Sequence, residues 1–222
     1  MQMGFYFDQT RCCGCLTCIV ACKDWNDVSA GPASWRRVIT IEKGTFPDLF
    51  VAFLSTGCHH CANPSCMEVC PVGAISKREK DGVVVVDPEI CLGKDACAMC
   101  LEACPYDAPQ FGEEDHAKMQ KCHFCLDRLD AHQKPACVDA CPMRALDAGP
   151  LDRLISLYGC GKQAEGHIYH DALRPSTVFK AKRETKGLSV KKIQMAPYRQ
   201  GAPLDLMSLL PEDEASGADH DY

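Results

Sequence analysis

Hydrophobic and polar positions alternate in only a few short stretches of this chain, and these stretches predict its strands. Residues 35–42 and 50–54 are rich in β-branched and apolar side chains, and residues 83–86 form a run of four valines. The dipeptide Asp81-Gly82 comes just before the valines and is typical of a hairpin turn. The pattern therefore predicts several short strands joined by turns.

One amphipathic helix is predicted directly after Gly149-Pro150. Leu151, Leu154, Ile155 and Tyr158 recur at the spacing of one helical face, and Gly159 follows them as a stop signal. We expect this apolar face to pack against the core or against a partner.

Beyond this helix the chain loses its periodicity. Residues 180–192 are basic, the end PEDEASGADHDY is acidic, and leucines and a methionine cluster within residues 204–210. These features are typical either of a solvated tail or of an arm laid on a partner subunit.

Charge and hydropathy exclude several protein classes. The net charge of -6 argues against general nucleic-acid binding, and no window reaches the 18 apolar residues of a membrane span. The opening MQMGFYFDQTR lacks the regions of a signal peptide, and Arg36-Arg37 is followed by a strand-like stretch instead of an export signal. We therefore expect a protein with neither a membrane span nor an export signal of its own.

Cysteine changes this picture, because eighteen of the 222 residues are cysteine and most of them stand in tight groups. The four groups are Cys12, Cys15, Cys18 and Cys22; Cys58, Cys61, Cys66 and Cys70; Cys91, Cys97, Cys100 and Cys104; and Cys122, Cys125, Cys137 and Cys141. The first group has the spacing of the bacterial ferredoxin run C-x2-C-x2-C-x3-C, and the others follow it with longer spacers. The spacing predicts iron-sulfur clusters.

Each such run serves two clusters. A loop with thiolates at every third residue wraps one cubane with three sulfurs, and the following helix turns the fourth sulfur toward a different cluster. Sixteen cysteines in four runs predict four [4Fe-4S] clusters. Cys13 and Cys160 are left over, and we interpret them as ordinary residues, although either could serve as a substitute ligand.

Other uses of cysteine fit less well. Zinc sites also use four thiolates, but their C-x2-C pairs are normally isolated, so a zinc-stabilised interaction module is a remote alternative. Disulfides are disfavoured because neighbours at successive x2 spacing cannot all bridge with sensible geometry. The C-x-x-C-H frame of c-type haem is absent from the sequence.

The order of the groups predicts an α+β fold with two nested ferredoxin-like domains. The inner domain would comprise residues 58–104, and the outer one would combine residues 1–57 with residues 105–150. Residues 151–222 would form the C-terminal helix and an extended arm.

Residues 3 to about 150, about two thirds of the chain, resemble the four-cluster electron-transfer subunit of the dimethyl sulfoxide reductase family. The matching stretches are GFYFDQTRCCGCLTCIVACKDWND, CHHCANPSCMEVCPVGAISKREKDGVVVVD, ACPYDAPQF and KCHFCLDRLDAHQKPACVDACPMRALDAGPLDRL. The resemblance implies a small subunit beside a molybdenum or tungsten bis-pterin catalytic subunit, often with a membrane anchor subunit that exchanges electrons with quinone.

The resemblance also implies how the thiolates are shared. Site I would be Cys12, Cys15, Cys18 and Cys141, and site II would be Cys22, Cys122, Cys125 and Cys137. Site III would be Cys58, Cys61, Cys66 and Cys104, and site IV would be Cys70, Cys91, Cys97 and Cys100. One departure concerns site IV, where the family usually has C-x2-C and this chain has three more residues between Cys91 and Cys97, so we expect a bulged loop.

No catalytic constellation accompanies the cysteines. The sequence contains neither the phosphate loop G-x-x-x-x-G-K nor the dinucleotide fingerprint G-x-G-x-x-G. His59 and His60 are expected beside the ligands or at the surface, since four thiolates are already available for each cluster. The charged residues expected to shift cluster potentials are Lys23, Lys77, Arg78 and Lys121.

These observations predict a subunit that conducts single electrons. The alternative from the same chemistry is a subunit of a hydrogenase or formate-oxidising complex, or a stand-alone polyferredoxin. Because clusters are inserted where thiols stay reduced, we expect cytoplasmic assembly, with export only alongside a partner that bears a twin-arginine signal.

Overall fold

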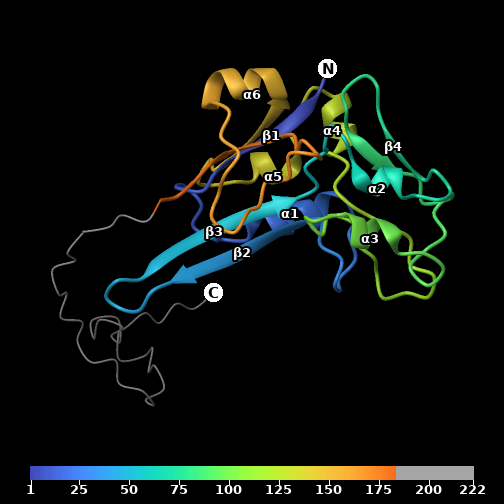
Figure 1. Ribbon diagram of the computed structural model, residues 1–222, viewed down its shortest axis with the longest axis horizontal. Coiled ribbons are helices and arrows are strands. Elements are labelled where there is room, and N and C mark those ends of the chain that lie inside the picture. The colour runs from blue at the N-terminus through green and yellow to red at the C-terminus, as the bar shows by residue number, and fades with distance from the viewer. Residues whose placement is uncertain (184–222) are drawn as a thin grey trace, which may run out of the picture. The chain divides into compact units, whose positions relative to one another are not determined.

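The computed structural model describes residues 1–183, which form a mixed α/β fold (Figure 1). The leucines and methionine of residues 204–210, the acidic end and most of the basic stretch lie outside the described residues. The elements are β1 (Met3–Asp8), α1 (Thr17–Trp25), β2 (Arg36–Lys43), β3 (Phe50–Gly57), α2 (Ser65–Glu68), β4 (Ile75–Lys77), β5 (Val84–Val86), α3 (Met99–Ala103), α4 (Leu126–Asp130), α5 (Ala136–Asp139), β6 (Leu146–Pro150), α6 (Leu151–Tyr158) and β7 (Thr177–Lys180).

A three-stranded sheet with β1 at its centre lies beside the core. Strand β6 is antiparallel to β1, and β7 is parallel to β1. Segments from both ends of the described chain therefore meet in this sheet. Every residue of β1 is buried. Successive side chains of a strand point to opposite faces, and accordingly Phe5 and Phe7 enter the main core while Tyr6 packs with Leu154 under α6.

Strands β2 and β3 confirm the two short strands predicted from residues 35–42 and 50–54, although β3 continues to Gly57, and they pair as a long hairpin. Their register runs from Arg36 opposite Gly57 to Lys43 opposite Phe50. Figure 1 shows the hairpin extending away from α2 and α3. At the base of the hairpin, β2 therefore begins with a buried residue, and β3 ends directly before the second cysteine group.

The predicted valine strand is confirmed as β5, which pairs with β4. The turn between them is longer than a two-residue hairpin, because the last paired residues are Lys77 and Val84. Gly82 lies within this turn in the left-handed region, with φ 70°, and the Val83 amide donates to Asp81 Oδ1 at 3.0 Å. The Asp-Gly dipeptide thus lies in the turn between the two strands, but this turn is a six-residue loop and not a two-residue hairpin turn.

Helix α6 confirms the amphipathic helix predicted after Gly149-Pro150. Gly159 ends it with φ 83°, and its amide donates to the Ile155 carbonyl oxygen at 2.9 Å. Leu154 is only 2% exposed and contacts the side chains of β1 and β7. Leu151, Leu154 and Tyr158 therefore pack on the three-stranded sheet. Ile155, the fourth residue of the predicted face, is 40% exposed.

Substitution of Leu154 by alanine is expected to reduce the free energy of unfolding by about 2–5 kcal/mol, because a buried leucine leaves a cavity that the sheet beneath it cannot close. Leu157→Ala is the matched control, since Leu157 lies on the same helix and is 59% exposed. Thermal unfolding of both variants measures the difference. Equal unfolding temperatures for the two variants would contradict this account of α6.

Candidate metal centres

All eighteen cysteines lie in the described part of the chain, and none of them forms a disulfide. Of the sixteen predicted ligands, nine are buried, six are half-buried and Cys15 is exposed. Cys13 and Cys160, which were not assigned to a cluster, are both exposed. Burial therefore separates most of the predicted ligands from the two remaining cysteines.

The backbone of the cysteine loops turns through left-handed conformations that place amides near sulfur. Gly14 has φ 73°, and a Cβ at this position would lie 2.5 Å from the Phe53 ring, so only glycine fits there. Phe124 has φ 66°, and its amide lies 3.4 Å from Cys122 Sγ. Backbone N–H groups around sulfur stabilise negative charge on the ligands and on a bound cluster.

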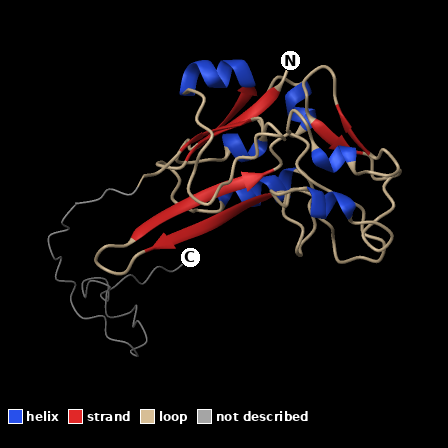
Figure 2. Cartoon of the chain, in the orientation of Figure 1, coloured by secondary structure: helices blue, strands red, loops and turns tan. Residues whose placement is uncertain are grey.

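The four thiols of site IV surround one cavity in the part of the chain that carries α2 and α3. Figure 2 shows that this part consists mainly of loops with short helices and strands. The remaining walls are apolar and include Ile75, Phe111 and Met119. Burial raises the pKa of Cys100 to about 11, and the neighbouring thiolates that add to this rise are those of Cys91, Cys97 and Cys70. The structure thus brings all four residues of site IV together.

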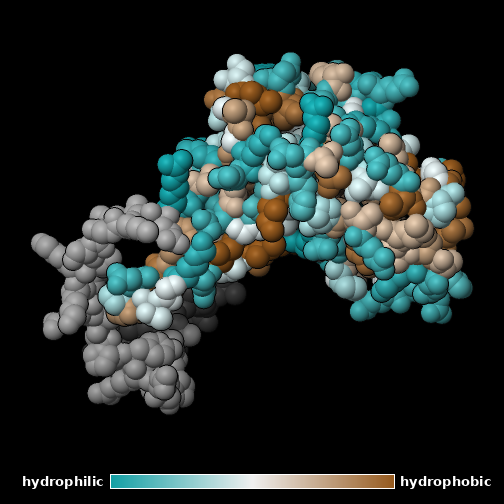
Figure 3. Space-filling model, viewed as in Figure 1, coloured by the Kyte–Doolittle hydropathy of each residue, from teal (hydrophilic) through white to brown (hydrophobic). Residues whose placement is uncertain are grey.

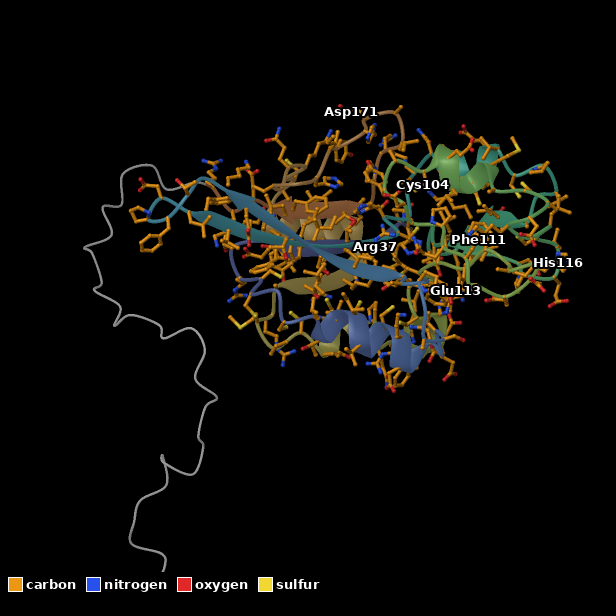
Figure 4. The ribbon with its side chains drawn as sticks, turned by 90° about the horizontal axis from the view of Figure 1, so that it is seen from below. Arg37, Cys104, Phe111, Glu113, His116 and Asp171 are labelled. Carbon is orange, nitrogen blue, oxygen red and sulfur yellow. The ribbon has the colours of Figure 1, made fainter. Side chains whose placement is uncertain are left out.

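The longer spacer between Cys91 and Cys97 folds as a loop against a later segment. The Lys94 amide donates to the Ala117 carbonyl oxygen at 2.9 Å, and the Cys97 amide donates to the Gly93 carbonyl oxygen at 2.9 Å. Figure 4 labels Phe111 and His116, which belong to the segment around this loop. The three additional residues therefore leave Cys91 and Cys97 on the same cavity.

The thiols of site I surround a second cavity, which is also lined by Phe7, Val38 and Leu146. The cysteines that line it are Cys12, Cys13, Cys15, Cys18 and Cys141. Burial raises the pKa of Cys12, although the amide of Gly14 opposes this rise. All four thiols assigned to site I therefore line one cavity, and the unassigned Cys13 lines it as well.

The thiols of sites II and III lie beside their predicted partners as well. Burial raises the pKa of Cys22 to about 12, and the thiolates of Cys137 and Cys125 contribute to this rise. Burial likewise raises the pKa of Cys61 to about 12, and the contributing thiolates are those of Cys58, Cys104 and Cys66. Burial raises the pKa of Cys122 far above its usual value, and Cys22 and Cys137 are among its neighbours.

Thiols of different sites also approach one another in a regular order. The pairs that join successive sites are Cys18 and Cys22, Cys58 and Cys122, and Cys66 and Cys100. These pairs connect site I to site II, site II to site III, and site III to site IV.

The chemistry of these thiols fits a metal cluster. A buried thiol resists ionisation because its anion is poorly solvated, and binding to iron compensates this cost by removing the proton and neutralising the charge. Within residues 1–183, no three Cys, His, Asp or Glu side chains are close enough to share one metal ion.

The two histidines beside the site III ligands are buried, so the surface location considered from the sequence is wrong for both. Burial lowers the pKa of His59 to about 3, and its Nδ1 lies 2.8 Å from Thr177 Oγ1. His60 Nδ1 accepts the Val84 amide at 3.1 Å, and burial keeps its pKa well below the usual value. Burial therefore disfavours the charged form of both rings, and both rings hold the loop that carries the site III ligands in place.

The charged residues selected from the sequence occupy different environments. Lys23 is half-buried and donates to the Gly31 carbonyl oxygen at 3.2 Å, and Arg78 pairs with Asp81 at 3.1 Å. Lys77 donates to the Cys61 carbonyl oxygen at 2.9 Å. Lys121 is 2% exposed and donates to the Cys122 carbonyl oxygen at 3.1 Å, so it is the buried cation of this set.

Sequence reasoning missed a second buried cation, Arg36, because it was considered only as part of a possible export signal. Its neighbour Arg37 points to the opposite side of β2 and donates to the Tyr106 carbonyl oxygen at 2.6 Å. Figure 4 labels Arg37 and Cys104, which precedes Tyr106 in the chain by two residues. Alternation along β2 was the available signal, since it requires one of two adjacent arginines to face the interior.

Comparison with known proteins identifies the chemistry of the cysteine groups. Residues 49–151 match the family described as the 4Fe-4S dicluster domain. The B subunit of the anaerobic dimethyl sulfoxide reductase of Haemophilus influenzae is 42% identical over 188 residues, which cover 81% of this chain and 89% of the relative.

Two relatives from Escherichia coli extend the comparison. The B subunit of its anaerobic dimethyl sulfoxide reductase is 45% identical over 166 residues, covering 71% of this chain and 78% of the relative. Its protein NrfC is 37% identical over 153 residues, covering 68% of this chain and 67% of the relative. The chain therefore belongs to the family of iron-sulfur subunits that includes the B subunits of anaerobic dimethyl sulfoxide reductases.

Proposed function

We propose that the chain relays single electrons through four [4Fe-4S] clusters, held at sites I to IV, to or from a molybdenum or tungsten bis-pterin catalytic subunit. The grouping of sixteen thiols into four sets, each with neighbours from its own set, is the observation that carries this proposal. Each bound cluster would accept and release one electron at a time.

The proximity of successive sites supports a single path through the protein. Thiols of sites I and II, II and III, and III and IV are neighbours, so an electron would pass the sites in numerical order or in reverse. The polypeptide contributes apolar walls that exclude water and amides that stabilise negative charge near sulfur. The direction of transfer depends on the potentials of the partners.

The division of the ligands supports two nested ferredoxin-like domains. All ligands of sites III and IV come from residues 58–104, and those of sites I and II come from residues 1–57 and 105–150. The outer domain would thus be completed only after the inner one has been synthesised. Within the third proposed segment, residues 151–222, the described α6 and β7 pack on β1 of the outer domain.

Both terminal sites lie beside exposed apolar side chains, which supports partner contacts at each. Near site IV, Leu92 and Met99 are 45% and 50% exposed, and near site I, Leu16 is 50% exposed. Figure 3 shows apolar surface on the side of the described residues that carries α2 and α3. Exposed apolar patches commonly mark protein contacts, so one site would face the catalytic subunit and the other a further redox partner.

A membrane anchor subunit is the further partner that we propose. Within the described residues, we find no helix with the length and apolar character needed to cross a bilayer. Attachment to a membrane would therefore be tested by fractionating cells that express this chain with and without the other subunits of its complex. Membrane association that persists without those subunits would contradict an anchor partner.

Metal analysis of the anaerobically purified complex is the direct test of four clusters. We expect about sixteen iron and about sixteen labile sulfide per chain, because each cubane contains equal numbers of both. The large subunit that co-purifies should contain a pterin-bound molybdenum or tungsten. A few zinc ions without sulfide would contradict the cluster proposal, and a nickel-containing large subunit would favour a hydrogenase instead.

A further inference from the structure

Arg36 is a buried cation whose charge has no carboxylate partner in the described part of the chain. The residue is 4% exposed, and its guanidinium donates to Ser55 Oγ at 3.3 Å. The guanidinium carbon lies 4.8 Å from the centroid of the Phe5 ring. A buried ion is costly unless nearby negative charge compensates it, so its surroundings must supply that charge.

The compensating groups are cysteine sulfurs. Burial alone lowers the pKa of Arg36, but surrounding thiolates raise it above its ordinary value. The thiolates that raise it are those of Cys137, Cys122, Cys18 and Cys22. The positive charge of Arg36 in turn opposes the rise that burial causes in the pKa of Cys137.

These sulfurs belong to two different sites. Cys137, Cys122 and Cys22 are ligands of the proposed site II, whereas Cys18 belongs to site I. Ser55 links Arg36 to site I, because its Oγ lies 3.5 Å from Cys18 Sγ and accepts from Arg36. Arg36 therefore lies between the two sites of the outer domain. Three of the four sulfurs that raise its pKa belong to site II, and one belongs to site I.

We propose that Arg36 is a positioning residue that raises the reduction potentials of sites I and II together, with the larger effect at site II. This inference rests on the proposed function, since it requires clusters at both sites. When either site gains one electron from its neighbour in the path, its negative charge increases by one unit. The fixed positive charge stabilises this reduced form without gaining or losing a proton.

The strand register explains why this arginine is available. Arg36 is the first residue of β2 and lies opposite Gly57, which is followed directly by the site III ligand Cys58. A Cβ on Gly57 would lie 2.7 Å from the Trp35 carbonyl oxygen, so the hairpin closes tightly at this point. The base of the hairpin thus holds the guanidinium among the sulfurs.

Redox titration of the assembled complex, followed by low-temperature EPR, tests the role of the charge. In Arg36→Gln, the equilibrium constant for reducing site II should fall at least tenfold, equivalent to about 59 mV for one electron. Site I should shift in the same direction by less, and sites III and IV should keep their potentials. The site II signal is identified by its loss in Cys137→Ser.

Arg37→Gln is the matched control, because it removes the same charge from the next residue, whose guanidinium lies on the other side of β2. It should leave sites I and II unchanged. Unchanged potentials at sites I and II in Arg36→Gln, with full iron content, would overturn the inference. Absence of all four clusters from the unmodified complex would instead overturn the proposed function.

Arg36→Lys covers the case in which Arg36→Gln does not assemble. Because the lysine variant keeps the charge, it should retain iron at sites I and II and potentials near those of the unmodified protein. Loss of both sites in the lysine variant as well would show that the shape of arginine is required, and the inference would be rejected.

Discussion

Replacement of Cys137 by serine is expected to stop electron transfer through the subunit almost completely. Cys137 is 3% exposed, lies near Arg36 and Cys125, and is a proposed ligand of the second station in the path. A serine hydroxyl is a much poorer ligand for iron than a thiolate, which favours loss of the cluster. In the proposed order of sites, site II lies between sites I and III, so its loss would interrupt the path.

Two measurements on the purified complex check this result. Iron should fall by about four atoms per chain, as one cubane is lost. One electron donor reacts with the cluster most distant from the catalytic subunit, and turnover with this donor should fall to background. Turnover with a donor that reduces the catalytic subunit directly should persist. Retention of turnover from the far end after loss of these irons would refute the proposed path.

Cys13→Ser is the control for general loss of a thiol. Cys13 also lines the site I cavity and is exposed, and the four assigned thiols are expected to hold the cluster without it. The variant should therefore keep its iron and its turnover. A loss of about four irons here would make Cys13 a ligand and require a new assignment of site I.

The cysteine groups were recognisable from sequence because their spacing is typical of cluster-binding runs, whereas the division of the thiols among sites I to IV was implied by the family resemblance and stays a prediction. Three closely spaced thiols in one run must wrap one cubane whatever surrounds them, as the cavity at site IV illustrates even with its longer loop. Helix α6 was predictable for a similar reason, since its period, proline and glycine are all local features.

The three-stranded sheet was not predicted, because its strands depend on contacts between distant residues. Residues 3–8 lack alternation, since Phe5 and Tyr6 are buried on opposite faces of a central strand. The stretch 177–180 becomes a strand only where it pairs with β1. Long-range pairing of this kind leaves little trace in local sequence.

Of the two buried cations, Lys121 was identified from the sequence and Arg36 was not. Lys121 was selected because it adjoins the ligand Cys122. Arg36 is distant in sequence from every sulfur that it faces, and the nearest of them is Cys22. Its position depends on the register of β2 against β3, which is set by packing of the whole hairpin.

Substitution of Lys121 by methionine is expected to lower the reduction potential of site III by about 70 mV. The ammonium group faces Cys66 of this site and opposes the rise that burial causes in the pKa of that thiol. A unit charge about 10 Å from a cluster, at an effective dielectric constant of about 20, contributes about 1.7 kcal/mol, or about 70 mV for one electron. Methionine preserves the length and apolar stem of the side chain while removing its charge.

EPR-monitored titration of the complex separates this effect from a general change in surface charge. Lys118→Met removes the same charge three residues earlier, where the ammonium donates to the Cys91 carbonyl oxygen from an exposed position. Salt and water screen that charge, so site III should keep its potential in this variant. Lys121→Arg should likewise keep the site III potential near its original value, because the charge remains.

The two buried cations together explain how one small subunit gives different environments to similar clusters. Arg36 faces sulfurs of sites I and II, and Lys121 faces Cys66 of site III, whereas site IV is enclosed mainly by apolar walls. Removal of Lys121 should therefore act on site III and removal of Arg36 on sites I and II. An equal shift at all four sites in Lys121→Met would mean that the charge acts through the net charge of the protein, and the local mechanism would be wrong.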